Sequence, residues 1–371
     1  MAGLYVHVPF CHAKCWYCDF YSVASDKTKG HYVEALAREW LLRRGEIEES
    51  TLSTIYFGGG TPSILTEPEL CSISEWLPKS DRILETTIEV NPEDVSMKKS
   101  FLWQQYLGVN RVSMGIQSLI DGELKSVGRR HSAEDAIRAV DILRQSGIEN
   151  VSLDLIYGLP GQTPETWRES LTRVLEMEPQ HLSAYMLSYE PGTRLTTRLS
   201  LGKIKETDED TLLAMYDILC ETTRRYGYEH YEISNFARPG LAARHNSAYW
   251  TGEPYLGLGP GAHSFDGKNR LFNPRNLKEW MRELDEGKVA AIIEDESDVD
   301  RVNDLIMVSL RTSKGLNLMD VPVRFRDEII KSASCCTRDR VIYDESEARL
   351  YIPENGWPVS DGTIASLFVE D

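Results

Sequence analysis

Six short segments of apolar and β-branched residues recur along the chain, and an amphipathic stretch follows each of the first five. They predict strands at 3–8, 54–57, 86–90, 111–116, 151–156 and 181–187. Strands that alternate with helices indicate a parallel sheet with right-handed crossovers. A closed barrel of this kind has eight units. Six units therefore predict an α/β fold built as a partial (β/α)6 TIM-like barrel.

Helix signals occupy the intervals between these strands. Residues 31–44 place Val33, Leu36 and Trp40 on one face of a helix. Thr66, followed three residues later by Glu69, forms a capping-box pattern, and Thr163-Pro164 also marks a helix start.

The rhythm changes after about residue 190, and we expect three parts. They are a barrel over 1–230, an extension over 231–298 and a C-terminal module over 299–371. In the last part, 299–316 predicts a helix that ends near Gly315, and 340–353 predicts a hairpin. Together they indicate a small α+β, winged-helix-like module.

Composition narrows the class of protein. The formal net charge is −17, which disfavours nucleic acid as a ligand because phosphate binding needs a basic surface. Seven cysteines, odd in number and unevenly spaced, indicate a reducing compartment. No apolar run approaches the ~20 residues of a transmembrane helix. We expect a cytoplasmic protein.

Three of the cysteines, Cys11, Cys15 and Cys18, lie within eight residues just after the first expected strand. A structural zinc site needs four ligands, which His7 or His12 would have to complete. The C-x3-C-x2-C spacing instead suits an iron–sulfur cube in which one iron lacks a protein ligand. Such an iron can chelate a small molecule through an amine and a carboxylate. The spacing favours this second interpretation.

Polar or glycine-rich residues follow other expected strands. Function in parallel βα folds lies at the carboxyl ends of the strands. The candidates there are Gly59, Gly60, Thr61, Glu89, Gln117 and Asp154. We expect them to meet the cysteine loop at one edge of the sheet.

Several motifs together resemble the radical S-adenosylmethionine (radical SAM) proteins, specifically the family of oxygen-independent coproporphyrinogen III oxidase and its haem-chaperone relatives. The motifs are "YVHVPFCHAKCWYCDF", "YFGGGTPS", "IEVNPED", "NRVSMGIQS", "GRRHS", "SLDLIYGLPGQT" and "HNSAYW". The resemblance implies a 4Fe–4S cluster on Cys11, Cys15 and Cys18. It also implies S-adenosylmethionine contacts by Tyr5, Gly59, Gly60, Thr61, Glu89, Gln117, Arg129 and Asp154.

Two functions within the family compete: radical decarboxylation of coproporphyrinogen III, and delivery of haem. The oxidase continues the cysteine motif with another cysteine, where this chain has Asp19-Phe20, and it carries an extension before its first strand. "HNSAYW" resembles the chaperone branch, in which His245 is the candidate haem ligand, with Tyr249 and His263 as alternatives. These features favour the chaperone. They cast doubt on the decarboxylation of coproporphyrinogen III, which is the coproporphyrinogen dehydrogenase activity of the oxidase.

A haem chaperone implies specific partners. We expect haem as cargo, haem-accepting client proteins and an electron donor, without nucleic acid. A peripheral membrane contact through clients is compatible with the chain, and nothing in it indicates an oligomeric state. Local arginines that would pair haem propionates are Arg238, Arg244, Arg270 and Arg275.

Overall fold

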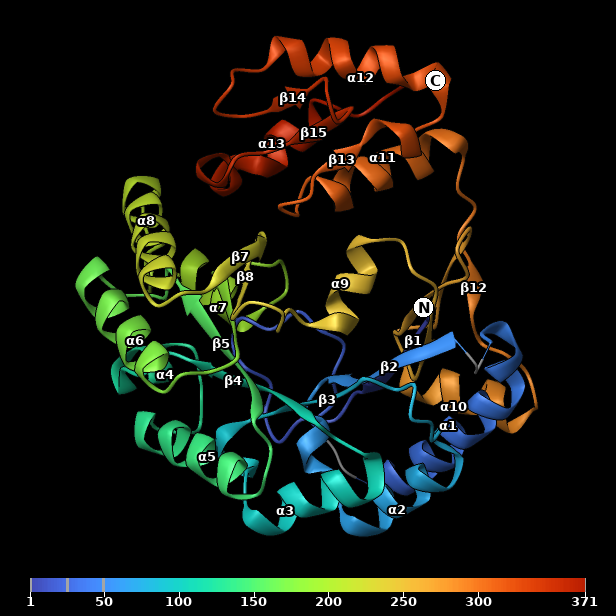
Figure 1. The fold of residues 1–371 in the computed structure, drawn as a ribbon. Helices are drawn as coiled ribbons and strands as arrows, with labels where there is room; N and C mark the ends of the chain where they lie inside the picture. The colour runs from blue at the N-terminus through green and yellow to red at the C-terminus, as the bar shows by residue number, and fades with distance from the viewer. Residues whose placement is uncertain (1, 25–26, 49–50, 371) are drawn as a thin grey trace.

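The computed structural model describes residues 2–24, 27–48 and 51–370. Its centre is a run of six parallel strands in chain order, which curves into an open arc (Figure 1). The strands are β1 (Ala2–Val8), β2 (Leu52–Gly59), β3 (Glu85–Val90), β4 (Arg111–Gln117), β5 (Asn150–Tyr157) and β6 (His181–Met186). Each matches an expected strand, and the predicted partial (β/α)6 barrel is confirmed.

Further strands extend the arc at both ends into one sheet of twelve strands. Beside β6 lie the antiparallel strands β8 (Asn235–Ala237) and β7 (Glu229–Glu232). Beside β1 lie β9 (Tyr255–Leu258), which is parallel to it, then β10 (His263–Phe265), β11 (Arg270–Phe272) and β12 (Ile292–Ile293). The segment 231–298 therefore contributes strands to the barrel sheet, and its boundaries stay a prediction.

The two faces of the parallel strands differ in character. On β1, Leu4, Val6 and Val8 are fully buried and belong to the main core. The concave face carries polar groups instead: Arg111 donates to Thr87 Oγ1 at 3.4 Å, and the Ser152 hydroxyl lies 2.7 Å from Nδ1 of His181. Because side chains alternate along a strand, one strand supplies both faces. The hollow of the arc is thus polar.

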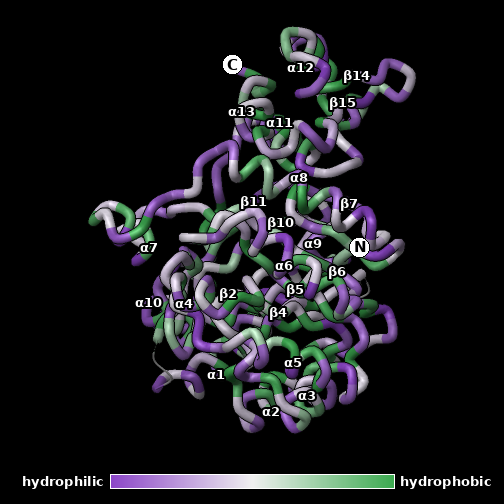
Figure 2. The backbone as a smooth tube through the Cα atoms, turned by 90° about the vertical axis from the view of Figure 1, so that its left-hand side faces the viewer, coloured by the Kyte–Doolittle hydropathy of each residue, from purple (hydrophilic) through white to green (hydrophobic). Residues whose placement is uncertain are grey.

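Helices pack on the outside of the arc (Figure 1). They are α1 (Lys29–Arg43), α2 (Glu67–Trp76), α3 (Met97–Leu102), α4 (Asp121–Ser126), α5 (Ala133–Gln145), α6 (Pro164–Glu176), α8 (Glu209–Arg225) and α10 (Leu277–Asp285). A further helix, α7 (Arg194–Ser200), lies against the loop after β1, where Leu195 N–H donates to the Trp16 carbonyl. The capping box at the start of α2 and the Thr163 cap of α6 form as predicted. Figure 2 shows hydrophobic residues along β2, β4 and β5, in the middle of the molecule. In the described part of the chain, no helix is long and apolar enough to cross a membrane.

One short helix, α9 (Arg244–Trp250), lies on the inner side of the arc (Figure 1). The carboxylate of Glu85 accepts hydrogen bonds from the backbone N–H groups of Arg244 and His245, at 2.9 and 3.0 Å. A carboxylate at a helix N-terminus satisfies orphan N–H groups and complements the helix dipole. Glu85, on β3, thereby fixes the helix that carries the "HNSAYW" motif.

The C-terminal residues form a small α+β module above the opening of the arc (Figure 1). It contains α11 (Asp298–Ser309), β13 (Leu316–Asn317), α12 (Val323–Cys335), the hairpin strands β14 (Ile342–Asp344) and β15 (Arg349–Tyr351), and α13 (Ser360–Ala365). The strand order is β13-β15-β14. The hairpin lies where predicted, and the module is compatible with a winged-helix-like fold.

The first helix of this module is shorter than expected. We predicted an end near Gly315, whereas α11 ends at Ser309. The backbone of Arg311 accepts a hydrogen bond from Ile233 N–H at 2.9 Å, and Thr312 bridges to Glu232. Pairing with the end of β7 therefore replaces the last helical turns.

Candidate functional site

The cysteine loop leaves the carboxyl end of β1 and is closed at its base. Cys11 N–H donates to the Val23 carbonyl at 3.1 Å, and Val23 N–H donates to the Pro9 carbonyl at 2.7 Å. Farther out, Trp16 N–H donates to the Val127 carbonyl, and the Trp16 carbonyl accepts from Leu195 N–H. These contacts hold Cys11, Cys15 and Cys18 as half-buried free thiols.

A chain of hydrogen bonds joins two of these sulfurs across three strand ends. Thr61, after β2, donates to Cys11 Sγ at 3.4 Å, and Asn91, after β3, donates to Thr61 Oγ1 at 3.3 Å. Arg129 donates to Asn91 Oδ1 at 2.7 Å and to Cys15 Sγ at 3.4 Å. The structure thus brings two expected residues to the cysteine loop: Thr61, which the strand-end rule predicted, and Arg129, which the family resemblance implied.

Burial shifts the acidity of the thiols. It raises the pKa of Cys11 above its ordinary value and that of Cys18 to about 11. Burial alone would lower the pKa of Arg129, but the nearby Tyr17 and Cys15 raise it, so the guanidinium stays charged. Binding iron requires thiolates, so loading this loop must release protons.

The loop is poorly suited to a single zinc ion. Both nitrogens of His7 are engaged, by Tyr5 Oη at 3.1 Å and by the Tyr21 carbonyl at 3.0 Å, and His12 Nε2 contacts Asp94 at 3.0 Å. Among the described residues, three ligand atoms lie within 4.8 Å of one another only in a separate group, Cys220, His230 and Glu354. An iron–sulfur cube, which binds each thiolate to a different iron, suits the loop better. The Nε atom of Arg129 is buried without a hydrogen-bonding partner, so it can still donate to a ligand bound beside the loop.

The glycines after β2 permit close packing of two strand ends. Gly59 has φ +105°, and a Cβ there would lie 2.4 Å from the His7 ring. A Cβ on Gly60 would lie 2.7 Å from the Phe10 carbonyl oxygen. We expected these glycines to approach a ligand; in the structure they first let β2 approach β1. The Gly59 N–H also donates to Glu89 Oε2 at 3.0 Å.

Two half-buried carboxylates face the hollow. Burial raises the pKa of Glu89 to about 7, with a further rise from Asp154, although Tyr56 donates to it at 2.9 Å. Burial also raises the pKa of Asp154, which accepts hydrogen bonds from Ser113 at 3.2 Å and from Ser152 at 3.4 Å. Both carboxylates lie on the polar face that the parallel strands present inward.

Gln117 ends β4 in a strained conformation. Its φ is +62°, in the left-handed region that side chains other than glycine seldom adopt. The strand also shifts register between Gly115 and Gln117. The Gln117 amide folds back over Gly115, where a Cβ would lie 2.7 Å from Nε2. Strain of this kind concentrates at functional sites.

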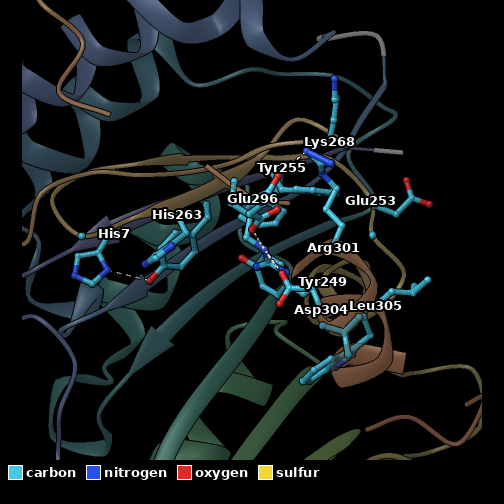
Figure 3. A pocket seen from close by; sticks show the side chains of 18 of the residues that line it. His7, Tyr249, Glu253, Tyr255, His263, Lys268, Glu296, Arg301, Asp304 and Leu305 are labelled. Atoms are coloured by element: carbon cyan, nitrogen blue, oxygen red, sulfur yellow. Dashed lines mark hydrogen bonds and ion pairs between the residues drawn. The ribbon is translucent and has the colours of Figure 1, made fainter. Parts of the chain in front are cut away.

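A cavity of about 620 Å³ lies beside this edge of the sheet (Figure 3). Three segments line it: β1 with the loop that follows, the stretch from α9 to Arg275 just after β11, and α11 with the residue Glu296 before it. Aromatic lining residues are Tyr5, Phe20, Tyr21, Tyr249, Trp250, Tyr255 and Phe265. Of the four arginines expected near a porphyrin, Arg270 and Arg275 line the cavity, whereas Arg238 and Arg244 do not.

The structure disagrees with His245 as a haem ligand. Its side chain is fully enclosed: Nδ1 lies 2.8 Å from Thr54 Oγ1, Nε2 lies 2.8 Å from Tyr249 Oη, and the ring stacks on Tyr56. Burial lowers its pKa to about 3. The "HNSAYW" motif therefore packs α9 against the sheet, and only Tyr249 and Trp250 of the motif line the cavity.

Sequence reasoning missed Asn91, which connects Thr61 to Arg129. It directly follows β3 in "VNPED", so its place just past a strand end was the available signal. Tyr5 lies beside Glu89: a Cβ on Gly58 would meet Glu89 Oε1 at 2.9 Å and Tyr5 Cε2 at 3.1 Å. Tyr5 also lines the cavity, which no motif indicated.

The partial barrel and its three-cysteine loop define a class of protein. The model of the radical SAM superfamily matches residues 5–174, so the chain carries a radical SAM domain, whose resident groups are a 4Fe–4S cluster and S-adenosylmethionine. The heme chaperone HemW of Bacillus subtilis is 35% identical over 76% of this chain and 75% of that protein. HemW of Lactococcus lactis is 30% identical over 99% and 97%. The chain belongs to the HemW family of radical SAM proteins.

A solved structure supports the fold. Coproporphyrinogen III oxidase (HemN) from Escherichia coli, a radical SAM enzyme, matches 99% of this chain and 90% of that chain with a TM-score of 0.83. The identity is 24%, so this likeness concerns the fold alone. It covers the C-terminal module as well as the barrel.

Proposed function

We propose that this protein is a haem chaperone that binds haem and transfers it to client proteins. The observation that carries the proposal is the 620 Å³ cavity, which has aromatic walls and adjoins the cysteine loop. Ligand pockets of ~300–1,000 Å³ with mostly apolar walls are typical of small-molecule and cofactor sites. Relatives named heme chaperones match most of the chain at 30–35% identity.

In this proposal Cys11, Cys15 and Cys18 hold the 4Fe–4S cluster. The residues that hold S-adenosylmethionine are Tyr5, Gly59, Gly60, Thr61, Glu89, Gln117, Arg129 and Asp154. When bound, the cluster supplies an electron for one-electron chemistry at the sulfonium. Within the chain, Arg129 orients Cys15, and ionised Glu89 attracts the cationic cofactor. Trp16 lies under Arg194, whose guanidinium is 4.2 Å from its ring, and shields the loop from water.

In this proposal the three expected parts of the chain together form the haem site. Residues of 1–230, 231–298 and 299–371 each contribute one wall of the cavity, through Tyr21, Phe265 and Leu305 among others. Flat aromatic walls suit the faces of a porphyrin. A site assembled from three parts can release its cargo when one part moves.

The partners follow from this activity. Haem is the cargo, haem-accepting proteins are the clients, and an electron donor would reduce the cluster. The free cysteines fit a cytoplasmic protein, and a membrane contact would come through clients. The net charge of −17 opposes a nucleic-acid partner.

The test combines binding, transfer and catalysis. Titration of the anaerobically purified full chain with haemin should give saturable binding, and mixing with a haem-depleted b-type haem enzyme should restore that enzyme's activity. Incubation with coproporphyrinogen III, S-adenosylmethionine and a reductant should give no protoporphyrinogen. Absent haem binding, or formation of protoporphyrinogen, would overturn the proposal.

A further inference from the structure

The eight histidines of the chain differ in what their ring nitrogens contact. Seven have a hydrogen-bonding partner: His7, His12, His31, His131, His181, His230 and His245. His263 is the exception, because within the described ranges neither of its nitrogens contacts a hydrogen-bonding or ion-pairing group. Its side chain is exposed and lines the cavity.

The strand β10 explains where this imidazole points. Side chains alternate along a strand, so His263 and Phe265 share one face, and both line the cavity. Ser264, on the opposite face, is buried and accepts a hydrogen bond from Arg43 at 3.1 Å. Figure 3 shows His263 between His7 and Tyr255 at the cavity wall. Burial and the charge of Arg275 lower the pKa of His263, which favours the neutral, iron-ligating form of the ring.

The cationic residues of the cavity fall into two groups. Arg270 and Arg301 are committed: Arg270 pairs with Asp304 at 2.6 Å, and Arg301 pairs with Asp298 at 3.1 Å. Arg275 and Lys268 also line the cavity, but neither side chain forms an ion pair or hydrogen bond within the part of the chain that is described. Two uncommitted cations match a ligand with two carboxylates.

From this geometry we infer that His263 is the axial ligand of a bound iron porphyrin, and that Arg275 and Lys268 pair with its two propionates. A dative bond from an imidazole nitrogen to iron forms and displaces the axial water or hydroxide of free haemin, and no bond of the porphyrin breaks. The inference rests on the proposed function, and it replaces His245 by a histidine that is free to bind. A cavity with aromatic walls, one unpartnered imidazole and two unpaired cations matches the three chemical parts of haem.

Haemin titration of the full chain tests the inference by absorption spectroscopy in the ferric and ferrous states. The wild type should show the bands of a histidine-ligated haem. His263→Ala should lose those bands and weaken binding by at least about tenfold, and added imidazole should restore the spectrum. Arg275→Ala should weaken binding by about tenfold with its spectrum intact, because a charged hydrogen bond is lost and the iron ligand remains.

Matched variants make the outcomes distinct. His31→Ala removes an exposed histidine that pairs with Asp285 and should change nothing. His263→Gln keeps the volume of the side chain and serves if the alanine variant does not fold. A wild type that binds no haem would sink the proposed function itself. A wild type that binds haem, with unchanged bands in folded His263→Ala or His263→Gln, would overturn this inference alone.

Discussion

The cysteine loop and the cavity are adjacent, yet they treat their polar groups in opposite ways. Around the loop, Thr61, Asn91 and Arg129 are bonded to one another and to two sulfurs. In the cavity, His263 and Arg275 have no such partner among the described residues. A resident cofactor benefits from ligands that are fixed in advance. A cargo that must leave is better held by groups near solvent, because water can solvate them after the cargo departs. Buried groups would instead be left unpaired in a low-dielectric core.

The two regions share a wall. Tyr5 lines the cavity, and its hydroxyl lies 3.1 Å from Nδ1 of His7, whose Nε2 contacts the Tyr21 carbonyl just after the cysteine loop. The His7 ring also lies against Gly59. Tyr5 and His7 therefore connect the two regions. Substitutions can show which residues support only cluster binding, which support only haem binding, and which support both.

The largest separation should come from removing the cluster ligands. Cys11, Cys15 and Cys18 replaced together by alanine should abolish the iron content and visible absorption of the reconstituted cluster, because no thiolate remains. Haemin affinity should persist, since no cysteine lines the cavity. Cys71→Ala, at an exposed free thiol, is the control and should retain both. Loss of haem binding in the triple variant would show that the two regions are not separable.

The cavity wall should be sensitive to the buried pair of Arg43 and Glu39. Arg43 donates to Glu39 at 3.2 Å and to the Gly257 carbonyl at 3.0 Å, so it ties α1 to β9. Arg43→Ala leaves a buried carboxylate uncompensated and should cost about 3–5 kcal/mol of unfolding free energy, measured in urea. The exposed Arg38–Asp285 pair provides the contrast, because Arg38→Ala should cost less than about 1 kcal/mol. Equal losses would mean that this network does not support the wall.

Much of the barrel could be predicted from the sequence because each strand carries its own local signal. Alternation as in "VSLDLI" sets Asp154 inward and Leu153 outward, and the strand-end rule then gathers residues far apart in sequence. Thr61 met the cysteine loop for this reason, whereas Arg129, which follows α4, was implied by the family resemblance alone. The rule applies to any residue just past a strand. Asn91 could therefore have been predicted by the same rule, although it was missed.

The cavity could not be predicted in the same way. It depends on α9 turning into the arc, and that placement is fixed by Glu85, a distant residue on β3. A motif shows that His245 matters but not which way its ring faces; enclosure by Thr54 and Tyr249 decides that. His263 was an alternative ligand only because it lies near His245 in sequence, and the packing of β10 is what shows its free imidazole.

Gly59→Ala should disturb both regions at once. The φ of +105° is costly for alanine, and its Cβ would collide with the His7 ring at 2.4 Å. We expect a loss of about 2–3 kcal/mol in unfolding free energy, with lower cluster loading and lower haemin affinity. Gly161→Ala is the matched control, with φ +82° and nothing within 4 Å, and should cost about 1–2 kcal/mol without affecting either ligand. Similar behaviour of the two variants would remove His7 as the link.

The smallest expected effect is a pH dependence confined to the cysteine-loop side. Because the pKa of Glu89 is raised to about 7, the carboxylate is mostly ionised at pH 8 and mostly protonated at pH 6. The ionised form attracts the positive charge of S-adenosylmethionine, so affinity for that cofactor should fall by about tenfold from pH 8 to pH 6. Calorimetric titration of the cluster-loaded protein measures this affinity, and Glu89→Gln should bind S-adenosylmethionine weakly at both pH values.

Haemin affinity should not follow the titration of Glu89, because Glu89 does not line the cavity. A parallel pH dependence for both ligands would show that Tyr5, which lies between Glu89 and the cavity, transmits the charge of Glu89 to the haem side.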